Sequence, residues 1–219
     1  MKKRMEMIAG YCPRCGCAAD IGCDHGIVAA ALIERGICEK VIATDISADS
    51  LKKARLLAEE HGIDDMMDFR AGDGLTVVGE GETNAIIIAG MGADLIAEIL
   101  EKGSKTAKSA DVLILVPHTH PERLRLYLSE NGFRITNESC IEEDGKYYNV
   151  MRAERGTPDI YSEEELLFGK RELYDEGYAT RLSHERKICE KIAGEMEKNG
   201  KDASLVKHRL EIIDREAAL

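Results

Sequence analysis

The residues best suited to chemistry lie in one short segment, Ala19–Gly26. An acidic residue, Asp20, is followed by Gly22 and Gly26, and the segment separates an apolar run from a helical pattern. This is typical of the strand-loop-helix turn of nucleotide-type α/β folds, where glycines let main-chain N–H groups approach a ligand at the helix N-terminus. Asp24 stands where the dinucleotide motif Gly-x-Gly-x-x-Gly needs a glycine. The spacing therefore suits S-adenosylmethionine (SAM), which offers an ammonium and a carboxylate rather than a pyrophosphate.

Two further acids end the strands predicted next along the chain. Asp45, about 20 residues beyond the first loop, is placed to accept hydrogen bonds from both ribose hydroxyls. Asp73 follows a third predicted strand and is placed to accept from the adenine amino group. Each acid alone could be a capping or turn residue. Ligands of open α/β sheets bind outside the carboxyl ends of the strands, so three acids at three successive strand ends predict one SAM site.

The expected SAM site combines these strand ends with the turn after the fourth strand. Its residues are Asp20, Gly22, Cys23, Asp24, His25, Gly26, Asp45, Ile46, Gly72, Asp73, Gly74, Ala89, Gly90 and Met91.

Alternating strand and helix patterns position these loops. We expect parallel strands ending at Ile21 and spanning 41–45, 67–71, 85–89 and 112–116. Asp144-Gly145 then predicts a type I′ hairpin between 133–143 and 146–154. The alternation predicts an α/β fold. Five parallel strands followed by an antiparallel pair match the Rossmann-like, seven-stranded sheet of class I SAM-dependent methyltransferases.

The chain changes character after Gly156. Two helical patterns with 4-3 apolar spacing flank the turn Asn199-Gly200 and predict an antiparallel hairpin of coiled-coil type. The first pattern includes Tyr178, Leu182, Cys189, Ile192 and Met196. We therefore expect a SAM-binding methyltransferase domain, residues 1–156, and a C-terminal helical domain, residues 157–219.

Composition narrows the class of protein. The 219 residues are 44% hydrophobic and 32% charged, typical of a soluble globular chain. With neither an apolar run of about 18 residues nor a signal peptide, we expect a cytoplasmic protein with no membrane association. The net charge of −11 counts against simple electrostatic binding of nucleic acid, although a local basic stripe can still bind it.

The seven cysteines, an odd number and mostly scattered, favour reduced thiols over a disulfide framework. Cys12-Pro13-Arg14-Cys15 looks like half a zinc ribbon, but a structural zinc ion usually needs four ligands. Cys17 and Cys23 are the near candidates, and Cys23 lies in the predicted cofactor loop. We therefore expect no metal.

Several segments of the chain closely resemble the bacterial TrmK family. They are Asp20-Ile21-Gly22-Cys23-Asp24-His25-Gly26, Arg70-Ala71-Gly72-Asp73-Gly74-Leu75, Ile88-Ala89-Gly90-Met91-Gly92, Glu130-Asn131-Gly132-Phe133 and Glu143-Asp144-Gly145-Lys146-Tyr147-Tyr148. The resemblance covers nearly the whole chain, and it implies SAM-dependent methylation of N1 of the adenine at position 22 of tRNA. This chain has Ile27-Val28-Ala29 where the family usually has Tyr-Leu-Pro, and Val116-Pro117-His118 where it tends to Gln-Pro-Asn.

The residues after the fourth predicted strand favour methylation of adenine at ring N1 rather than at its exocyclic amine. Enzymes that methylate the exocyclic amine commonly carry Asn/Asp-Pro-Pro-aromatic there, whereas this chain has Ala89-Gly90-Met91-Gly92. Ring N1 attacks through an in-plane lone pair without first losing a proton, and positive charge develops on the base. A nearby carboxylate would stabilise that charge, and Asp24 is the candidate catalytic residue. Its alternative role is to order the loop through main-chain N–H groups.

The substrate base must leave its stack to expose N1. We expect Met91, Pro117 and His118 to lie near the base, and Arg181, Lys187 and Lys191 to hold the tRNA backbone. The alternative for these cations is a solvated helix face. We expect a monomer or a weak dimer.

Two rival functions remain open on the sequence. One is a SAM methyltransferase acting on another RNA, a protein or a small molecule. The other is a non-catalytic RNA-binding protein that has kept the fold, although the intact Gly22, Gly26, Asp45 and Asp73 argue against an inactive pocket.

Overall fold

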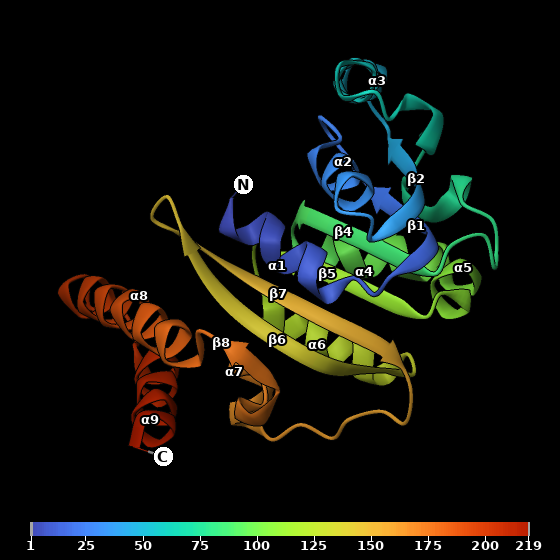
Figure 1. The fold of residues 1–219 in the computed structure, drawn as a ribbon. Helices are drawn as coiled ribbons and strands as arrows, with labels where there is room; N and C mark the ends of the chain where they lie inside the picture. Colours follow the sequence, from blue (N-terminus) through green and yellow to red (C-terminus); the bar gives the residue numbers. More distant parts are fainter. Residues whose placement is uncertain (1, 219) are drawn as a thin grey trace.

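The computed structural model describes residues 2–218 and is built around one mixed sheet (Figure 1). Within that range the sheet has eight strands in the order β3-β2-β1-β4-β5-β7-β6-β8. The strands are β1 (Cys15–Ile21), β2 (Cys38–Asp45), β3 (Met67–Ala71), β4 (Ala85–Met91), β5 (Val112–Pro117), β6 (Phe133–Glu143), β7 (Lys146–Arg155) and β8 (Tyr174–Glu176). Strands β1 to β5 run parallel, β7 is antiparallel to β5 and β6, and β8 is parallel to β6.

Helices cover both faces of the sheet. Those before β6 are α1 (Lys3–Tyr11), α2 (Ile27–Glu34), α3 (Ala48–His61), α4 (Ala93–Lys102), α5 (Ser104–Ser109) and α6 (Pro121–Glu130). Apolar side chains of α1, α2 and α3 pack on one face, and those of α4, α5 and α6 pack on the other. Strands β4 and β5 are apolar and buried because both of their faces are covered. The predicted class I methyltransferase fold is confirmed.

Local sequence signals explain where several elements begin and end. Ser47 caps α3 by accepting a hydrogen bond from the main-chain N–H of Ser50, and Gly62 ends the helix at φ 65°. Asp144 and Gly145 both have positive φ, 52° and 71°, as a type I′ turn requires. The predicted hairpin between β6 and β7 is therefore confirmed.

Among the α-helices and strands of residues 2–218, four were not predicted: α1, α5, α7 (Glu163–Phe168) and β8. Helix α1 precedes the first predicted strand, and α7 and β8 lie in the segment assigned to the helical tail. Strand β8 adds an eighth strand to the seven that were expected. It spans only three residues, too few to show the alternation of apolar and polar side chains that predicts a strand. It forms because β6 has an unpaired edge to which β8 can hydrogen-bond.

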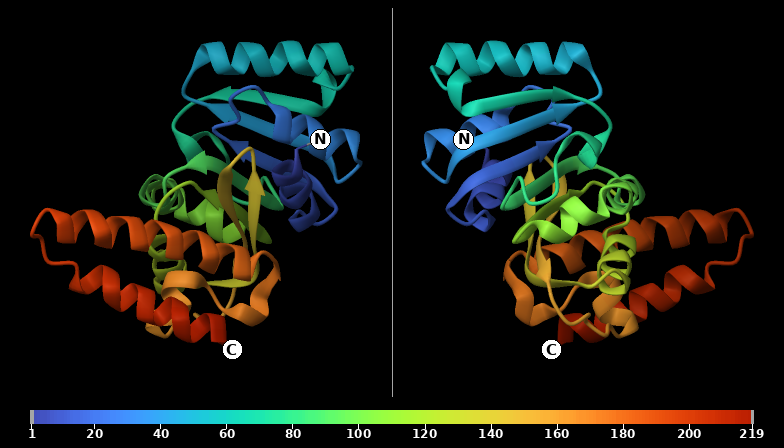
Figure 2. Two further views of the ribbon diagram at one scale, coloured as in Figure 1. Left: turned by 90° about the vertical axis from the view of Figure 1, so that its left-hand side faces the viewer. Right: turned by 90° about the vertical axis from the view of Figure 1, so that its right-hand side faces the viewer.

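The C-terminal segment ends in the expected helical hairpin, α8 (Tyr178–Lys198) and α9 (Ser204–Ala218). Figure 2 shows this hairpin extending from the body of the molecule, away from the end of the sheet where α3 lies. Tyr178, Leu182 and Cys189 are buried as predicted. The prediction for Ile192 was wrong: it is 41% exposed, whereas the next residue, Ala193, is buried.

A buried ion pair anchors the start of this segment to the sheet. Arg125 of α6 is fully buried and donates to Oε1 of Glu138 of β6 over 2.8 Å. The same guanidinium donates to the main-chain oxygens of Leu166 and Leu167 in α7. Helix α7 is therefore held against α6 rather than lying in a free linker.

No helix within residues 2–218 is both long enough and apolar enough to cross a membrane.

Candidate cofactor and substrate site

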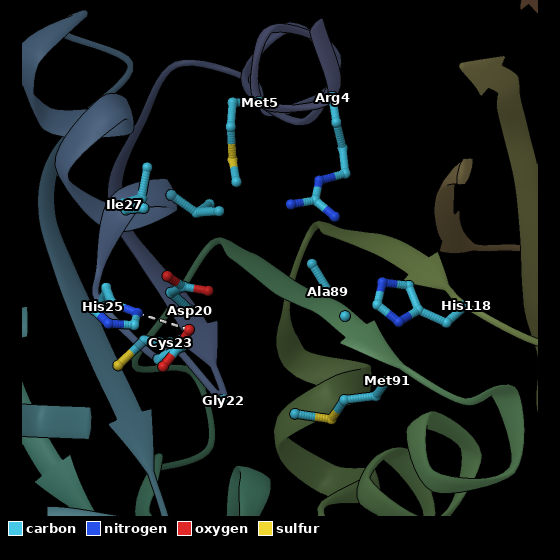
Figure 3. A pocket seen from close by; sticks show the side chains of 13 residues that line it. Arg4, Met5, Asp20, Gly22, Cys23, His25, Ile27, Ala89, Met91 and His118 are labelled. Atoms are coloured by element: carbon cyan, nitrogen blue, oxygen red, sulfur yellow. Dashed lines mark ion pairs between the residues drawn. The ribbon is translucent and has the colours of Figure 1, made fainter. Parts of the chain in front are cut away.

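A cavity of about 430 Å³ opens at the carboxyl ends of β1, β4 and β5 (Figure 3). The loop after β1 and the end of β4 form two of its sides, and the first turn of α1 lies across it. Its lining residues are Arg4, Met5, Asp20, Gly22, Cys23, Asp24, His25, Ile27, Val28, Ala89, Gly90, Met91 and His118. The topology thus brings together the predicted loops of the first, fourth and fifth strands.

Asp20 places a buried carboxyl group at the base of this cavity. Its side chain is 3% exposed, and Oδ2 has no hydrogen-bond partner among residues 2–218. Burial raises the pKa of Asp20 to about 7, and the negative charge of Asp45 acts in the same direction. A buried carboxylate oxygen without a partner is costly unless a cation or donor completes it. The Asp20 carboxyl group is therefore suited to accept a hydrogen bond from the ammonium of SAM.

Two glycines let the loop after β1 pass close to its neighbours. Gly22 has φ 70°, and a Cβ there would lie 2.1 Å from Cε of Met91. Gly26 has φ 72°, and a Cβ there would lie 2.9 Å from Cβ of Ala54. Side chains are strained in this left-handed region, and both spaces are already filled. The loop backbone thus lies directly against Met91 on one side and α3 on the other.

Asp45 joins the ends of β1 and β2. Its Oδ2 accepts from the main-chain N–H of Asp24 over 3.1 Å, and its Oδ1 accepts from that of Ser47 over 2.8 Å. A carboxylate has about four acceptor positions, so both oxygens can still accept from ribose hydroxyls. Asp24 itself has φ 49°, and its carboxylate pairs with Nδ1 of His25 over 2.8 Å, as the dashed line in Figure 3 marks.

The residues expected around adenine lie outside the cavity lining. Ile46, beside Asp45, is 78% exposed and offers an apolar surface. Asp73 pairs with Nζ of Lys102 over 2.9 Å. Gly72 and Gly74 pack against Val77 and Ile99, where a Cβ would lie 2.2 and 2.9 Å from the nearest atoms.

The loop after β5 corrects one prediction. Pro117 is buried at the end of β5, so it has no surface to offer a substrate. The next residue, His118, is exposed and points into the cavity (Figure 3). Partial desolvation and the nearby cations Arg4 and Lys146 lower the pKa of His118, so its imidazole is neutral at pH 7.

Sequence reasoning missed the contribution of α1. Arg4 and Met5 point from its first turn into the cavity (Figure 3). The Arg4 guanidinium lies 4.4 Å from the ring centroid of Tyr148, whose ring is 5.7 Å from that of His118. The apolar face of Ile8, Ala9 and Tyr11 was the signal that could have predicted this helix. Two residues of the cavity lining, Arg4 and His118, are therefore both in contact with the Tyr148 ring.

The tail residues predicted to hold RNA fall into two groups. Arg181 is 4% exposed and pairs with Glu185, so the prediction that it contacts RNA is corrected. Lys187 and Lys191 are exposed, and neither forms an ion pair within the described part of the chain. One turn before Lys187, His184 stacks on Tyr147 of β7 with ring centroids 3.8 Å apart.

Comparisons with known proteins agree with this geometry. Residues 1–151 match the family model described as "Methyltransferase domain". The chain is 32% identical to the tRNA (adenine(22)-N(1))-methyltransferase of Bacillus subtilis (strain 168), over 97% of this chain and 95% of that protein. The crystal structure of the B. subtilis m1A22 tRNA methyltransferase TrmK has a TM-score of 0.84 at 28% identity, covering 99% and 98% of the two chains. A Streptococcus pneumoniae structure in complex with S-adenosyl-L-methionine has a TM-score of 0.88 at 28% identity, over 99% of both chains.

Proposed function

The chain belongs to the family of tRNA (adenine(22)-N(1))-methyltransferases, and from this premise we propose that it transfers the methyl group of SAM to N1 of adenine 22 in tRNA. The observation that carries the proposal is the buried Asp20 oxygen without a partner, at the base of a cavity at the strand ends. SAM presents an ammonium to such a group and supplies an electrophilic methyl on its sulfonium.

Three strand ends support the placement of SAM. We place the methionine end in the loop from Gly22 to Gly26, with its ammonium on Asp20. Asp45 would accept from the ribose hydroxyls with its remaining lone pairs. Ile46 would cover one face of the adenine, and Asp73 would accept from the adenine amino group while keeping Lys102 as its partner.

The target base would enter between Met91 and His118. Both side chains line the cavity, with Met91 reaching Gly22 of the loop after β1 and His118 following the end of β5 (Figure 3). A neutral His118 can stack on a base or donate a hydrogen bond without adding positive charge beside the methylated ring. The exposed carboxylate of Asp24 would offset the charge that develops when N1 attacks the methyl group.

A cationic face of α8 supports recognition of tRNA by residues 157–219. His184, Lys187 and Lys191 follow i, i+3, i+7 spacing and therefore share one face of the helix. His184 stacks on Tyr147 of β7, and the next residue of that strand, Tyr148, contacts Arg4 and His118 of the cavity lining from the other face, so the β6–β7 hairpin contacts both α8 and the site. We propose that its lysines hold tRNA phosphates while the base occupies the cavity of residues 1–156.

We further propose that the enzyme acts in the cytoplasm as a monomer or weak dimer. Multi-angle light scattering across a range of concentrations measures the oligomeric state.

The deciding experiment maps methylation on tRNA. An unmodified tRNA transcript is incubated with purified protein and SAM, and primer extension detects N1 methylation as a stop because it blocks pairing. We expect one stop at position 22, and none with a transcript carrying guanine there. Methylation at another adenine would overturn the position, and SAM binding without any methyl transfer would overturn the activity.

A further inference from the structure

Three cysteine thiols lie together at the amino ends of β1 and β2, whereas the SAM cavity lies at the carboxyl ends of the strands. Cys12 is the residue that ends α1, and Cys15 and Cys38 are the first residues of β1 and β2. The Sγ atoms of Cys15 and Cys38 are 3.2 Å apart, those of Cys12 and Cys38 are 3.9 Å apart, and all three lie within 4.8 Å of one another. All three are free thiols, and the activity proposed above uses none of them.

The fold itself creates this cluster. Cys15 and Cys38 are direct partners in the parallel register of β1 and β2. Cys12 is brought beside them by the short turn Cys12-Pro13-Arg14-Cys15 between α1 and β1. The third thiol therefore comes from 23 positions along the chain, which is why the sequence showed only half of a metal motif.

The distances match those of one tetrahedral zinc ion. Zinc–sulfur bonds of about 2.3 Å at tetrahedral angles place the sulfur atoms about 3.8 Å apart. The thiol separations here bracket that value. Cys12 and Cys38 are buried, whereas Cys15 is half-buried and lines a surface cavity with Arg14 and Glu39. That cavity gives an ion a path to the thiols.

We propose that Cys12, Cys15 and Cys38 bind one Zn²⁺ ion as three thiolates, with a solvent molecule as the fourth ligand on the side of the surface cavity. Each thiol gives up its proton when the ion binds. The ion joins the end of α1 to two central strands. Because Arg4 and Met5 of α1 line the SAM cavity, the same ion fixes the helix that covers the site.

Cys17 is the natural control for this proposal. It lies two residues beyond Cys15 and is also half-buried. It packs against the apolar cluster of α4, α5 and α6, whereas Cys15 packs against that of α1, α2 and α3. Replacing Cys17 thus removes a thiol of similar exposure on the same strand without removing a ligand.

The test measures metal in the full-length protein after any affinity tag has been removed. Inductively coupled plasma mass spectrometry is expected to find about one zinc ion per chain. Cys15→Ser should lose the zinc, and Cys17→Ser should keep it. Cobalt added to the zinc-free protein should give thiolate-to-cobalt charge-transfer bands and the intense visible bands of tetrahedral cobalt, and Cys15→Ser should abolish both.

Three results would overturn the proposal. The first is a folded protein, by circular dichroism, that contains no zinc and gives no cobalt bands. The second is equal zinc in wild-type protein, Cys15→Ser and Cys17→Ser. The third is another use of the same thiols. It would be seen either as iron with inorganic sulfide in place of zinc, or as a disulfide between Cys15 and Cys38 in protein that still takes up no zinc after reduction. The cobalt titration uses wild-type protein, so the test does not depend on the folding of variants at the buried Cys12 and Cys38.

Discussion

The main-chain N–H of Asp24 donates a hydrogen bond to Oδ2 of Asp45 over 3.1 Å, which joins the loops at the ends of β1 and β2. One carboxylate therefore has two tasks: it orders the loop that carries the candidate catalytic residue, and it is the proposed acceptor for the ribose hydroxyls. Substitutions at the two aspartates separate these tasks.

Asp45→Ala is expected to weaken SAM binding by about 1–3 kcal/mol, the range for charge-assisted hydrogen bonds. It should also slow methyl transfer at saturating SAM, because the N–H of Asp24 loses its acceptor. Calorimetry and single-turnover rates measure the two effects. Unchanged SAM affinity in a folded variant would remove Asp45 from the ribose site.

Asp24→Asn should lower kcat by roughly 10²–10³, the scale for loss of one electrostatic stabiliser. SAM affinity should change little, because the main-chain N–H bond to Asp45 is retained. His25→Ala is the matched control, since it removes the side-chain partner of Asp24 but keeps the carboxylate. A parallel loss of SAM binding and activity in Asp24→Asn would make Asp24 a residue that only orders the loop.

The buried Asp20 predicts a pH dependence of SAM binding. With a pKa of about 7, its carboxyl is neutral at lower pH and cannot attract an ammonium. The Kd for SAM should therefore fall as pH rises from 5.5 through 7, by up to about tenfold per unit on the acidic side. Asp20→Asn should bind more weakly and show no such rise in affinity.

The same ionisation affects the free protein in the opposite sense. The pKa of Asp20 is raised from 3.8 to about 7, so its contribution to stability is fully present below the lower value and is lost progressively as pH rises to about 7. Thermal melts with and without SAM should diverge over this window. A pH-independent Kd in the wild-type protein would contradict the role of Asp20.

Charge reversal on α8 tests the tRNA surface. Lys187→Glu with Lys191→Glu should weaken tRNA binding and reduce the slope of log affinity against log salt by about 1 for each phosphate that the variant no longer binds. SAM binding should be unaffected. Lys40→Glu with Lys108→Glu makes the same change of net charge on exposed lysines away from α8. Equal weakening in the two double variants would show that net charge, rather than this helix face, governs tRNA binding.

The pair of Arg125 and Glu138 predicts a large effect on stability. Glu138→Ala leaves a fully buried guanidinium without its carboxylate and should lower the free energy of unfolding by about 3–5 kcal/mol. The double change of Arg125→Met with Glu138→Leu should cost less, because no buried charge remains. Urea denaturation measures both. Equal losses of stability would place the cost in packing rather than in the unpaired charge.

Local patterns in the sequence determined most of the fold of residues 1–156. Glycines, caps and buried apolar runs act over a few residues, so strands β1 to β7 and the turn at Asp144-Gly145 could be predicted from spacing alone. The positions of Asp20 and Asp45 at strand ends also followed, because parallel strands end at a common edge. The roles proposed for these residues are expectations for the experiments above.

Only the tertiary structure decided which distant groups meet. The pairing of β1 with β2 brings Cys38 to Cys15, and burial of Pro117 and Arg181 excludes both from the substrate surface that was predicted for them. Helix α1 covers the cavity with Arg4, and β8 joins the sheet because β6 presents an open edge. These outcomes depend on contacts between segments far apart in the chain, whereas a sequence pattern reports only the preferences of neighbouring residues.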